Sequence, residues 1–417
     1  MRRRIITELA KEYAKEESEV KNNLEDSVII TPYVTRNVKS RVVVDKSKIN
    51  IEEQIFLDYY KLLLNRYCNL KFPNRSYIMA EIMNIVPDLH RYHAYTIYKF
   101  DFKDFFNTVS SKKSFAYICE TLNLKTFEYE FLKKYTSVDR KLIPGIGLHN
   151  TLVEIIGERF NLEIKKIFKE SCIYYARYVD DCILILDEKI DEDKIEKVIF
   201  KLMKQCFGDK VKINDTKTDY YNSSCVNSKF DYLGYEFKKG QNPKSEFKFG
   251  IALNKLEKYT NSINDIVLEY KVTNNVEILS FKLELLFKRV VYYGARKNSN
   301  KYRWQVRGIS DSYKELKRFM KNSKDFSKIT KDTENFFTRT VERSFTRNRV
   351  NFPAKIKNQI KNNKFTSCFL NNKTLLLHQK IGLKHNTLKQ RLYIVDNSNL
   401  ESCSYSELAN KLLSIIK

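Results

Sequence analysis

The apolar positions of this 417-residue chain recur at helical spacing in some segments and form strand-like runs in others. Residues 1–27 predict a charged amphipathic helix, and residues 28–50 predict short strands. Helical spacing continues over residues 52–70, and a turn at 72–76 precedes a predicted helix at 77–85. The N-terminal region is therefore expected to mix helices with a little sheet.

Two β-rich runs in the middle of the chain carry carboxylates at their centres. Residues 95–106 contain Asp101, and residues 172–186 contain the adjacent Asp180 and Asp181. Burying a charge is costly unless a partner compensates it, and Mg²⁺ is typically held by one or two carboxylates plus substrate phosphates. The simplest geometry places the Asp pair at the tip of a hairpin beside the strand of Asp101, as a two-metal phosphoryl-transfer site requires.

Helical and strand patterns alternate after these runs. Asp191 is expected to cap a helix whose apolar residues lie at i, i+3, i+4 and i+7 between 195 and 206. Residues 210–214 predict a strand, and residues 230–239 and 246–253 predict a hairpin around a Gly-Gln-Asn-Pro turn. Strand, helix, hairpin, helix and strand together predict a ferredoxin-like α+β domain.

The last third of the chain, from about residue 254, changes to helical spacing. Segments 276–296, 310–321 and 333–347 are clearly periodic, and basic residues are frequent among them. This pattern predicts a mostly α-helical C-terminal region.

Composition narrows the class of partner. The net charge of +25 and the pI near 9.5 favour a polyanion, because Lys and Arg are spread along the whole chain. The 42% of hydrophobic residues is enough for a sizeable core. The eight cysteines form no C-x-x-C pair, which argues against a zinc site and is typical of reduced thiols. Neither a signal segment nor a membrane-spanning run is visible, so a cytoplasmic location is expected.

Five segments resemble motifs A to E of the reverse transcriptases in their order and spacing. They are 100–106 (Phe-Asp-Phe-Lys-Asp-Phe-Phe) for motif A, 143–154 for B, 178–181 (Tyr-Val-Asp-Asp) for C, 214–218 for D and 230–235 for E. A lone four-residue string recurs by chance, whereas motifs A, C and E in the correct order are specific. The resemblance implies an α+β right-hand polymerase with fingers and a ferredoxin-like palm, followed by the mostly α-helical region.

The resemblance also implies a division of the chain and a chemistry. Residues 1–94 would form an N-terminal helix and fingers, residues 95–253 the palm, and residues 254–417 an α-helical thumb and C-terminal extension. The implied activity is DNA polymerisation by two-metal nucleotidyl transfer, directed by RNA or independent of a template. The implied partners are deoxynucleoside triphosphates, a DNA product and an RNA template, and a homo-oligomer stays open.

Individual roles follow from the matched motifs. Asp101 and Asp180 would bind two Mg²⁺ or Mn²⁺ ions with the help of Asp181, and the backbone carbonyl of Phe102 would add an oxygen ligand. Phe106 would lie under the sugar and select deoxynucleotides, with packing in the core as the alternative.

Basic residues are expected to hold the phosphates. Arg41, Arg75 and Lys217 are the candidates for the incoming triphosphate, since Arg forks suit phosphate oxygens, and a solvated role is the alternative for each. A nucleic-acid strand would be held through salt-sensitive contacts by basic residues of the last third. These are Lys255, Lys258, Lys288, Arg289, Arg303, Lys317, Arg318, Arg343 and Arg347.

Motif B departs from the common Pro-Gln-Gly pattern. Gly145 or Ile146 stands where Gln is expected, and Glu154 follows in a helical pattern. These features resemble the abortive-infection and other defence-associated bacterial reverse transcriptases, which implies a role in anti-phage defence and a start of synthesis on a protein hydroxyl. Two alternatives remain: a retron- or group II intron-type enzyme that copies a partner RNA, and a nucleic-acid-binding protein with a decayed palm.

Overall fold

A computed structural model describes residues 1–25, 32–38, 41–137, 141–295, 302–320, 325–361, 374–395 and 400–415. The chain forms two compact units. The first unit contains residues 1–78 and 92–225, and the second contains residues 79–91 and 226–417. The predicted division at residues 94 and 253 into fingers, palm and thumb stays a prediction.

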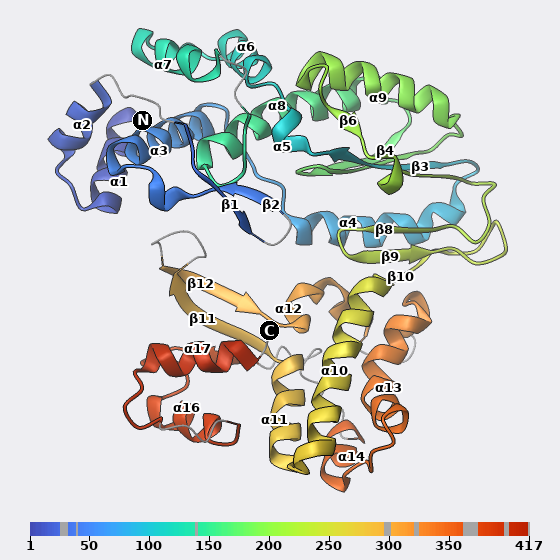
Figure 1. Cartoon of the computed structure of the whole chain (residues 1–417). Helices are drawn as coiled ribbons and strands as arrows, with labels where there is room; N and C mark the ends of the chain where they lie inside the picture. The colour runs from blue at the N-terminus through green and yellow to red at the C-terminus, as the bar shows by residue number, and fades with distance from the viewer. Residues whose placement is uncertain are drawn as a thin grey trace. The chain divides into compact units, whose positions relative to one another are not determined.

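A five-stranded sheet of the first unit has the order β4-β5-β3-β6, and β7 also pairs with β3 (Figure 1). Its strands pair antiparallel. The bounds are Thr96–Lys103 for β3, Cys172–Tyr178 for β4, Asp181–Leu186 for β5, Lys212–Ile213 for β6 and Asp219–Asn222 for β7. The β-branched and aromatic runs predicted as strands are therefore strands, and β4 and β5 form the expected hairpin.

Two long helices cover one face of this sheet (Figure 1). They are α8 (Gly147–Ile167) and α9 (Glu192–Phe207). Phe102 of β3 reaches both, with ring centroids 5.6 Å from Phe160 and 5.2 Å from Phe207. This aromatic packing fixes β3, the strand that carries Asp101, in a rigid core.

The rest of the first unit packs around this core. It comprises α1 (Arg2–Tyr13), α2 (Glu17–Glu25), the β1–β2 hairpin (Thr35–Val38 and Arg41–Val44), α3 (Ile51–Tyr67), α5 (Phe105–Thr108), α6 (Ser111–Thr121) and α7 (Thr126–Thr136). The helix predicted over 1–27 is wrong in its length, because Ala14 adopts a left-handed conformation with φ 52° and ends α1. Helix α4 (Arg75–Asp88) passes from the first unit into the second.

The second unit begins with a three-stranded sheet and continues with helices. Strands β8 (Lys229–Tyr232), β9 (Tyr235–Lys238) and β10 (Lys248–Ile251) are followed by α10 (Leu253–Thr273), α11 (Val276–Phe287), α12 (Ile309–Ser312), α13 (Lys331–Arg347) and α14 (Ala354–Lys361). The predicted hairpin exists as β9–β10. Its first arm is itself a hairpin, because Leu233 and Gly234 both have positive φ and reverse the chain.

A second three-stranded sheet corrects the expectation of a mostly helical last third. Strands β11 (Arg289–Ala295), β12 (Tyr302–Arg307) and β13 (Thr374–Leu377) pack against α16 (His385–Leu392) and α17 (Tyr405–Ile415). The helix predicted over 276–296 ends at Phe287, since the Val-Val-Tyr-Tyr run that follows favours a strand. The helix predicted over 310–321 is a short α12 plus a 3₁₀ segment, Lys314–Phe319.

Two smaller observations complete the fold. Asp191 stands at the N-cap position of α9, but its side chain makes no capping hydrogen bond and instead lies 3.5 Å from Lys194. Among the helices of the described residues, none combines the length and apolar character needed to cross a membrane.

Candidate metal centre and nucleotide site

Three carboxylates meet where β3 lies beside the β4–β5 hairpin. Asp101 pairs in register with Asp181, the first residue of β5, and Asp180 lies in the two-residue turn before it. The backbone N–H of Phe102 donates to the carbonyl of Asp180 over 3.2 Å and ties the turn to β3. Carboxylate oxygens of Asp101, Asp180 and Asp181 all lie within 4.8 Å of one another.

Burial and mutual repulsion disfavour negative charge on this cluster. Burial raises the pKa of Asp181 to about 6, and the nearby Asp180 and Asp101 contribute to the rise. Burial and Asp101 likewise raise the pKa of Asp180 above its ordinary value. A site that concentrates carboxylate oxygens against their own repulsion fits a hard divalent cation, because oxygen ligands suit Mg²⁺ and Mn²⁺. The donor set therefore fits the predicted metal.

The hairpin tip that presents Asp180 is strained and supported from below. Val179 has a φ of 63°, an unusual conformation for a β-branched residue that persists only where the surroundings enforce it. Arg177 Nη1 donates to the carbonyl of Val179 over 3.0 Å. The guanidinium of Arg177 therefore holds the turn directly beneath the catalytic candidates.

Arg177 is itself fixed by α8. Its Nη2 lies 2.7 Å from Glu154 Oε1 with side-chain exposures of 0% and 5%, and its Nε donates to Asn161 Oδ1 over 3.0 Å. A Cβ on Gly157 would lie 2.3 Å from Nη2, so only glycine leaves room for the guanidinium. Sequence reasoning noted Glu154 as a departure in motif B without a role. An Arg within an apolar strand was the available signal for its partner.

Two residues of motif D bind the Asp101 carboxylate. Lys217 Nζ lies 2.8 Å from Asp101 Oδ2, and Asn214 Nδ2 donates to the same oxygen over 3.2 Å. The backbone N–H of Asn214 also donates to the Asp101 carbonyl over 2.8 Å, which fixes the loop after β6. The hydrogen bond to Asp101 raises the pKa of Lys217, whose side chain stays 57% exposed. Asn214 was not among the predicted site residues, although its motif was.

Arg41 approaches the cluster from the β1–β2 hairpin. Its charge acts on Asp180 and lowers the pKa of that carboxyl against the larger effects of burial and Asp101. The hairpin is anchored to motif B, because the N–H of Val44 donates to the carbonyl of Pro144 over 2.8 Å. Gly145, at φ 121°, allows this approach, since a Cβ there would lie 2.9 Å from the Val44 backbone. The structure thus brings Arg41 and Lys217 to the carboxylates.

For three other predicted residues, the structure gives a position that does not test the predicted role. Phe106 is half-buried at the start of α5 and packs edge-on against Phe105, with centroids 6.3 Å apart. Phe102 buries its ring in the core, and its carbonyl as a metal ligand stays a prediction. Arg75 is the half-buried first residue of α4, and its contact with a nucleotide stays a prediction as well.

The polar residues of motif B have structural partners. His149 is fully buried, donates from Nδ1 to the Ile143 carbonyl over 2.7 Å, and accepts at Nε2 from the Tyr135 hydroxyl over 2.7 Å. Thr151 is also buried and donates to Asn65 Oδ1 over 2.9 Å. These side chains hold α8 in place rather than facing a substrate.

The basic residues predicted to hold nucleic acid differ in exposure and in partners. Three have internal partners: Lys288 lies 2.6 Å from Glu284, Arg289 lies 3.1 Å from Asp311, and Arg318 donates to the Ala80 carbonyl over 3.0 Å. Lys317 is half-buried. The exposed group consists of Lys255, Lys258, Arg303, Arg343 and Arg347.

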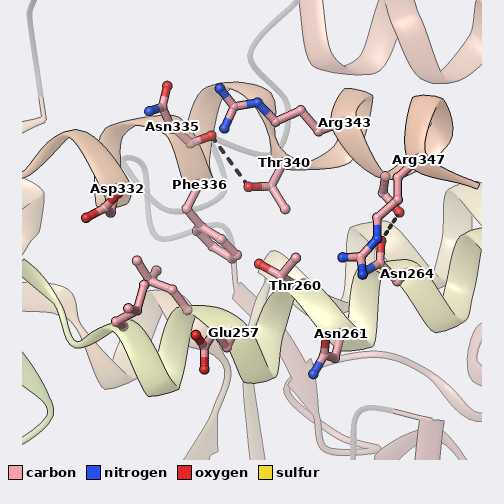
Figure 2. A pocket seen from close by; sticks show the side chains of 13 residues that line it. Glu257, Thr260, Asn261, Asn264, Asp332, Asn335, Phe336, Thr340, Arg343 and Arg347 are labelled. Carbon is pink, nitrogen blue, oxygen red and sulfur yellow. Dashed lines mark hydrogen bonds between the residues drawn. The ribbon is translucent and has the colours of Figure 1, made fainter.

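Two of the exposed arginines line a cleft between α10 and α13 with a volume of about 440 Å³ (Figure 2). Figure 2 shows Arg347 toward one end and Asp332 toward the other. Ser344 donates to Asn264 Oδ1 over 2.6 Å across the two helices. The charge of the cleft is mixed, because Glu257 and Asp332 line it together with Arg343 and Arg347.

Comparisons with known proteins give only distant similarities. No protein-family model and no curated protein matches the chain. Telomerase from Candida albicans in complex with a fragment of telomeric RNA is 12% identical over 95% of this chain and 70% of that chain, with a TM-score of 0.38. Apo telomerase from Candida tropicalis is 11% identical over 90% and 66%, with a TM-score of 0.37. A truncated form from Candida tropicalis is 16% identical over 48% and 49%, with a TM-score of 0.34, so the chain spans about half of it. At these TM-scores we conclude nothing about this chain from the similarities.

Proposed function

We propose that this chain is a reverse-transcriptase-like nucleotidyltransferase that polymerises deoxynucleotides with the help of divalent metal ions. The observation that supports this best is the meeting of Asp101, Asp180 and Asp181 within 4.8 Å, from two paired strands that carry the motif A and motif C sequences. A decayed palm would be free to lose one of the three carboxylates, and all three are present.

The three carboxylates would hold Mg²⁺ or Mn²⁺, which when bound lowers the pKa of an attacking hydroxyl and stabilises charge on the leaving oxygen. The protein contributes positioning and charge. Asn214 fixes the Asp101 carboxylate, and the largely exposed Lys217 ammonium is placed to exchange that carboxylate for a phosphate oxygen. Arg41 adds a second cation on the side of Asp180. Phe106 would act on the sugar.

A matched pair of substitutions tests this proposal. Asp101→Asn removes a charge from the cluster, and Asp104→Asn removes one from an exposed residue three positions later in the same motif. We expect Asp101→Asn to abolish Mg²⁺- or Mn²⁺-dependent incorporation of labelled dNTP, a loss of about 10³-fold or more if metal ions supply several kcal/mol. Asp104→Asn should retain activity. Incorporation by Asp101→Asn at the wild-type rate would overturn the proposal.

The choice of template and primer is a further part of the proposal. Motif B lacks the usual Gln, which favours the abortive-infection type with synthesis started on a Tyr hydroxyl. Purified protein would then carry DNA that stays attached on a denaturing gel and is missing from Asp180→Ala. A partner RNA that co-purifies and is copied would instead favour the retron or intron type.

A further inference from the structure

The C-terminal sheet β12-β11-β13 has two different faces. Val290 and Tyr292 of β11 are buried together with the leucines of β13, α16 and α17. Alternate residues of a strand point to opposite faces, so Tyr293 lies on the other face. Its cross-strand partner is Trp304 of β12. Tyr293 is 48% exposed and Trp304 is 47% exposed, although both are large aromatic residues.

A third ring extends this exposed pair. His378 directly follows β13, whose last residue Leu377 pairs with Tyr292, so His378 comes level with Tyr293. The ring centroid of His378 lies 5.4 Å from that of Trp304 and 6.5 Å from that of Tyr293. The centroids of Tyr293 and Trp304 lie 5.4 Å apart. We call Tyr293, Trp304 and His378 the aromatic platform.

The platform is held in place by its own backbone. Sheet pairing fixes the backbone of Tyr293 and Trp304, their rings contact each other, and the N–H of Ile381 donates to His378 Nδ1 over 3.4 Å. Because Nδ1 accepts this bond, the neutral imidazole carries its proton on Nε2, which can donate to a ligand. Rings fixed in this way lose little conformational entropy when a flat group stacks on them.

The charge around the platform selects the kind of ligand. The segment 288–307, which contains β11 and β12, has no Asp or Glu, and neither has the segment 374–391 around β13. The exposed basic residues among the described part of these segments are Arg303, Arg307, Lys380 and Lys384, whereas Lys288, Arg289 and Lys389 are paired with Glu284, Asp311 and Glu401. Exposed rings among cations suit a ligand with flat apolar groups on a polyanionic backbone, which describes single-stranded nucleic acid.

We propose that the aromatic platform binds single-stranded DNA or RNA by stacking bases on Trp304, Tyr293 and His378. Stacking on aromatic rings tolerates any base, so the platform binds without a sequence code. Arg303 and Arg307 lie on the opposite face of the sheet, because they pair with Gly294 and Val290, so the exposed Lys380, two residues after His378, is the basic residue that would contact a phosphate next to the rings. The site belongs to the second unit and does not require the metal centre, so it holds a strand whether or not the chain polymerises.

The chain contains a single tryptophan, which makes Trp304 a built-in reporter. The probes are a 12-residue oligo-dT and an oligo-rU of the same length, added to the full-length Asp180→Ala protein so that no synthesis occurs. We expect saturable quenching of tryptophan fluorescence at the concentrations at which anisotropy of the labelled oligonucleotide reports binding. Binding seen by anisotropy without any change in Trp304 emission would overturn the proposal.

Substitutions separate stacking from general electrostatic attraction. Trp304→Leu should raise the Kd for both oligonucleotides about 5- to 100-fold, as expected for loss of one base stack, and Trp304→Phe should recover most of the affinity. Phe200→Leu is the matched control, because Phe200 of α9 is also 47% exposed but lies in the other unit. Equal Kd values for wild type and Trp304→Leu, with both proteins folded by circular dichroism, would overturn the proposal. So would a dimer in light scattering that dissociates in Trp304→Leu, since a second copy would then cover the rings.

Discussion

The carboxylate centre of the first unit and the aromatic platform of the second hold their side chains in opposite surroundings. Asp101, Glu154 and Arg177 are nearly inaccessible, and each has a specific partner within the protein. Tyr293 and Trp304 are about half exposed. A buried ionic network depends on every member for folding as well as function, whereas an exposed ring affects mainly the ligand. Substitutions at the carboxylate centre should therefore change stability as well as activity, whereas substitutions at the aromatic platform should change mainly the affinity for a ligand.

The largest effect on stability is expected from Arg177, which supports the Val179–Asp180 turn. Arg177→Met leaves Glu154 buried without its partner and frees the Val179 carbonyl, so the free energy of unfolding should fall by about 3–5 kcal/mol in urea denaturation. The exposed Arg303→Met should change it by less than about 0.5 kcal/mol.

A second variant sharpens this test. Replacing both partners, Glu154→Leu with Arg177→Met, removes the unpaired charge and should recover much of the loss. The buried network would be misassigned if Arg177→Met were as stable as Arg303→Met.

The next effect concerns Asp181 and pH. Its folded pKa of about 6 exceeds the ordinary 3.8, so the metal-free folded protein binds this proton more tightly than the unfolded chain. The stabilisation of the folded state by this tighter proton binding is fully present below about pH 4 and is lost as the pH rises through 6. Asp181→Asn should therefore stabilise the metal-free protein by about 1–3 kcal/mol at pH 7.5 and by little at pH 4. Thermal unfolding at the two pH values measures this, and an equal effect at both would contradict it.

A smaller effect is expected at the nucleotide. Lys217→Met removes a cation that lies 2.8 Å from Asp101 and is mostly exposed, so the apparent KM for dNTP should rise about 10-fold. Lys212→Met is the matched control, because Lys212 is exposed on the strand before the same loop. Steady-state kinetics would contradict the role of Lys217 if both variants had the wild-type KM.

The smallest effect per residue is expected at the exposed arginines of α13. Arg343→Ala with Arg347→Ala should reduce the slope of log K against log salt by about 1–2, since each phosphate contact contributes about 0.7–0.9. Lys288→Ala should leave the slope unchanged, because Lys288 is paired with Glu284. An unchanged slope in the double variant would show that Arg343 and Arg347 do not contact phosphates.

The same contrast explains what the sequence could predict. Asp101 and the Asp180–Asp181 pair interrupt apolar strands, and a charge in such a place has few physical explanations, so their meeting could be anticipated. The Glu154–Arg177 pair joins a helix to a strand, and no local periodicity specifies such a partner. Strand β11 was mistaken for the end of a helix because its apolar run fits both periods, and the platform was missed with it.

The central claim is that the three carboxylates hold divalent metal, and Mn²⁺ binding followed by electron paramagnetic resonance tests it most directly. Titration of the wild-type chain should show loss of the free Mn²⁺ signal with saturation, and Asp104→Asn should behave in the same way. Asp101→Asn and Asp180→Asn should each weaken binding about 10-fold or more, because each removes a charged oxygen ligand. Wild-type affinity in both Asp101→Asn and Asp180→Asn would contradict the claim.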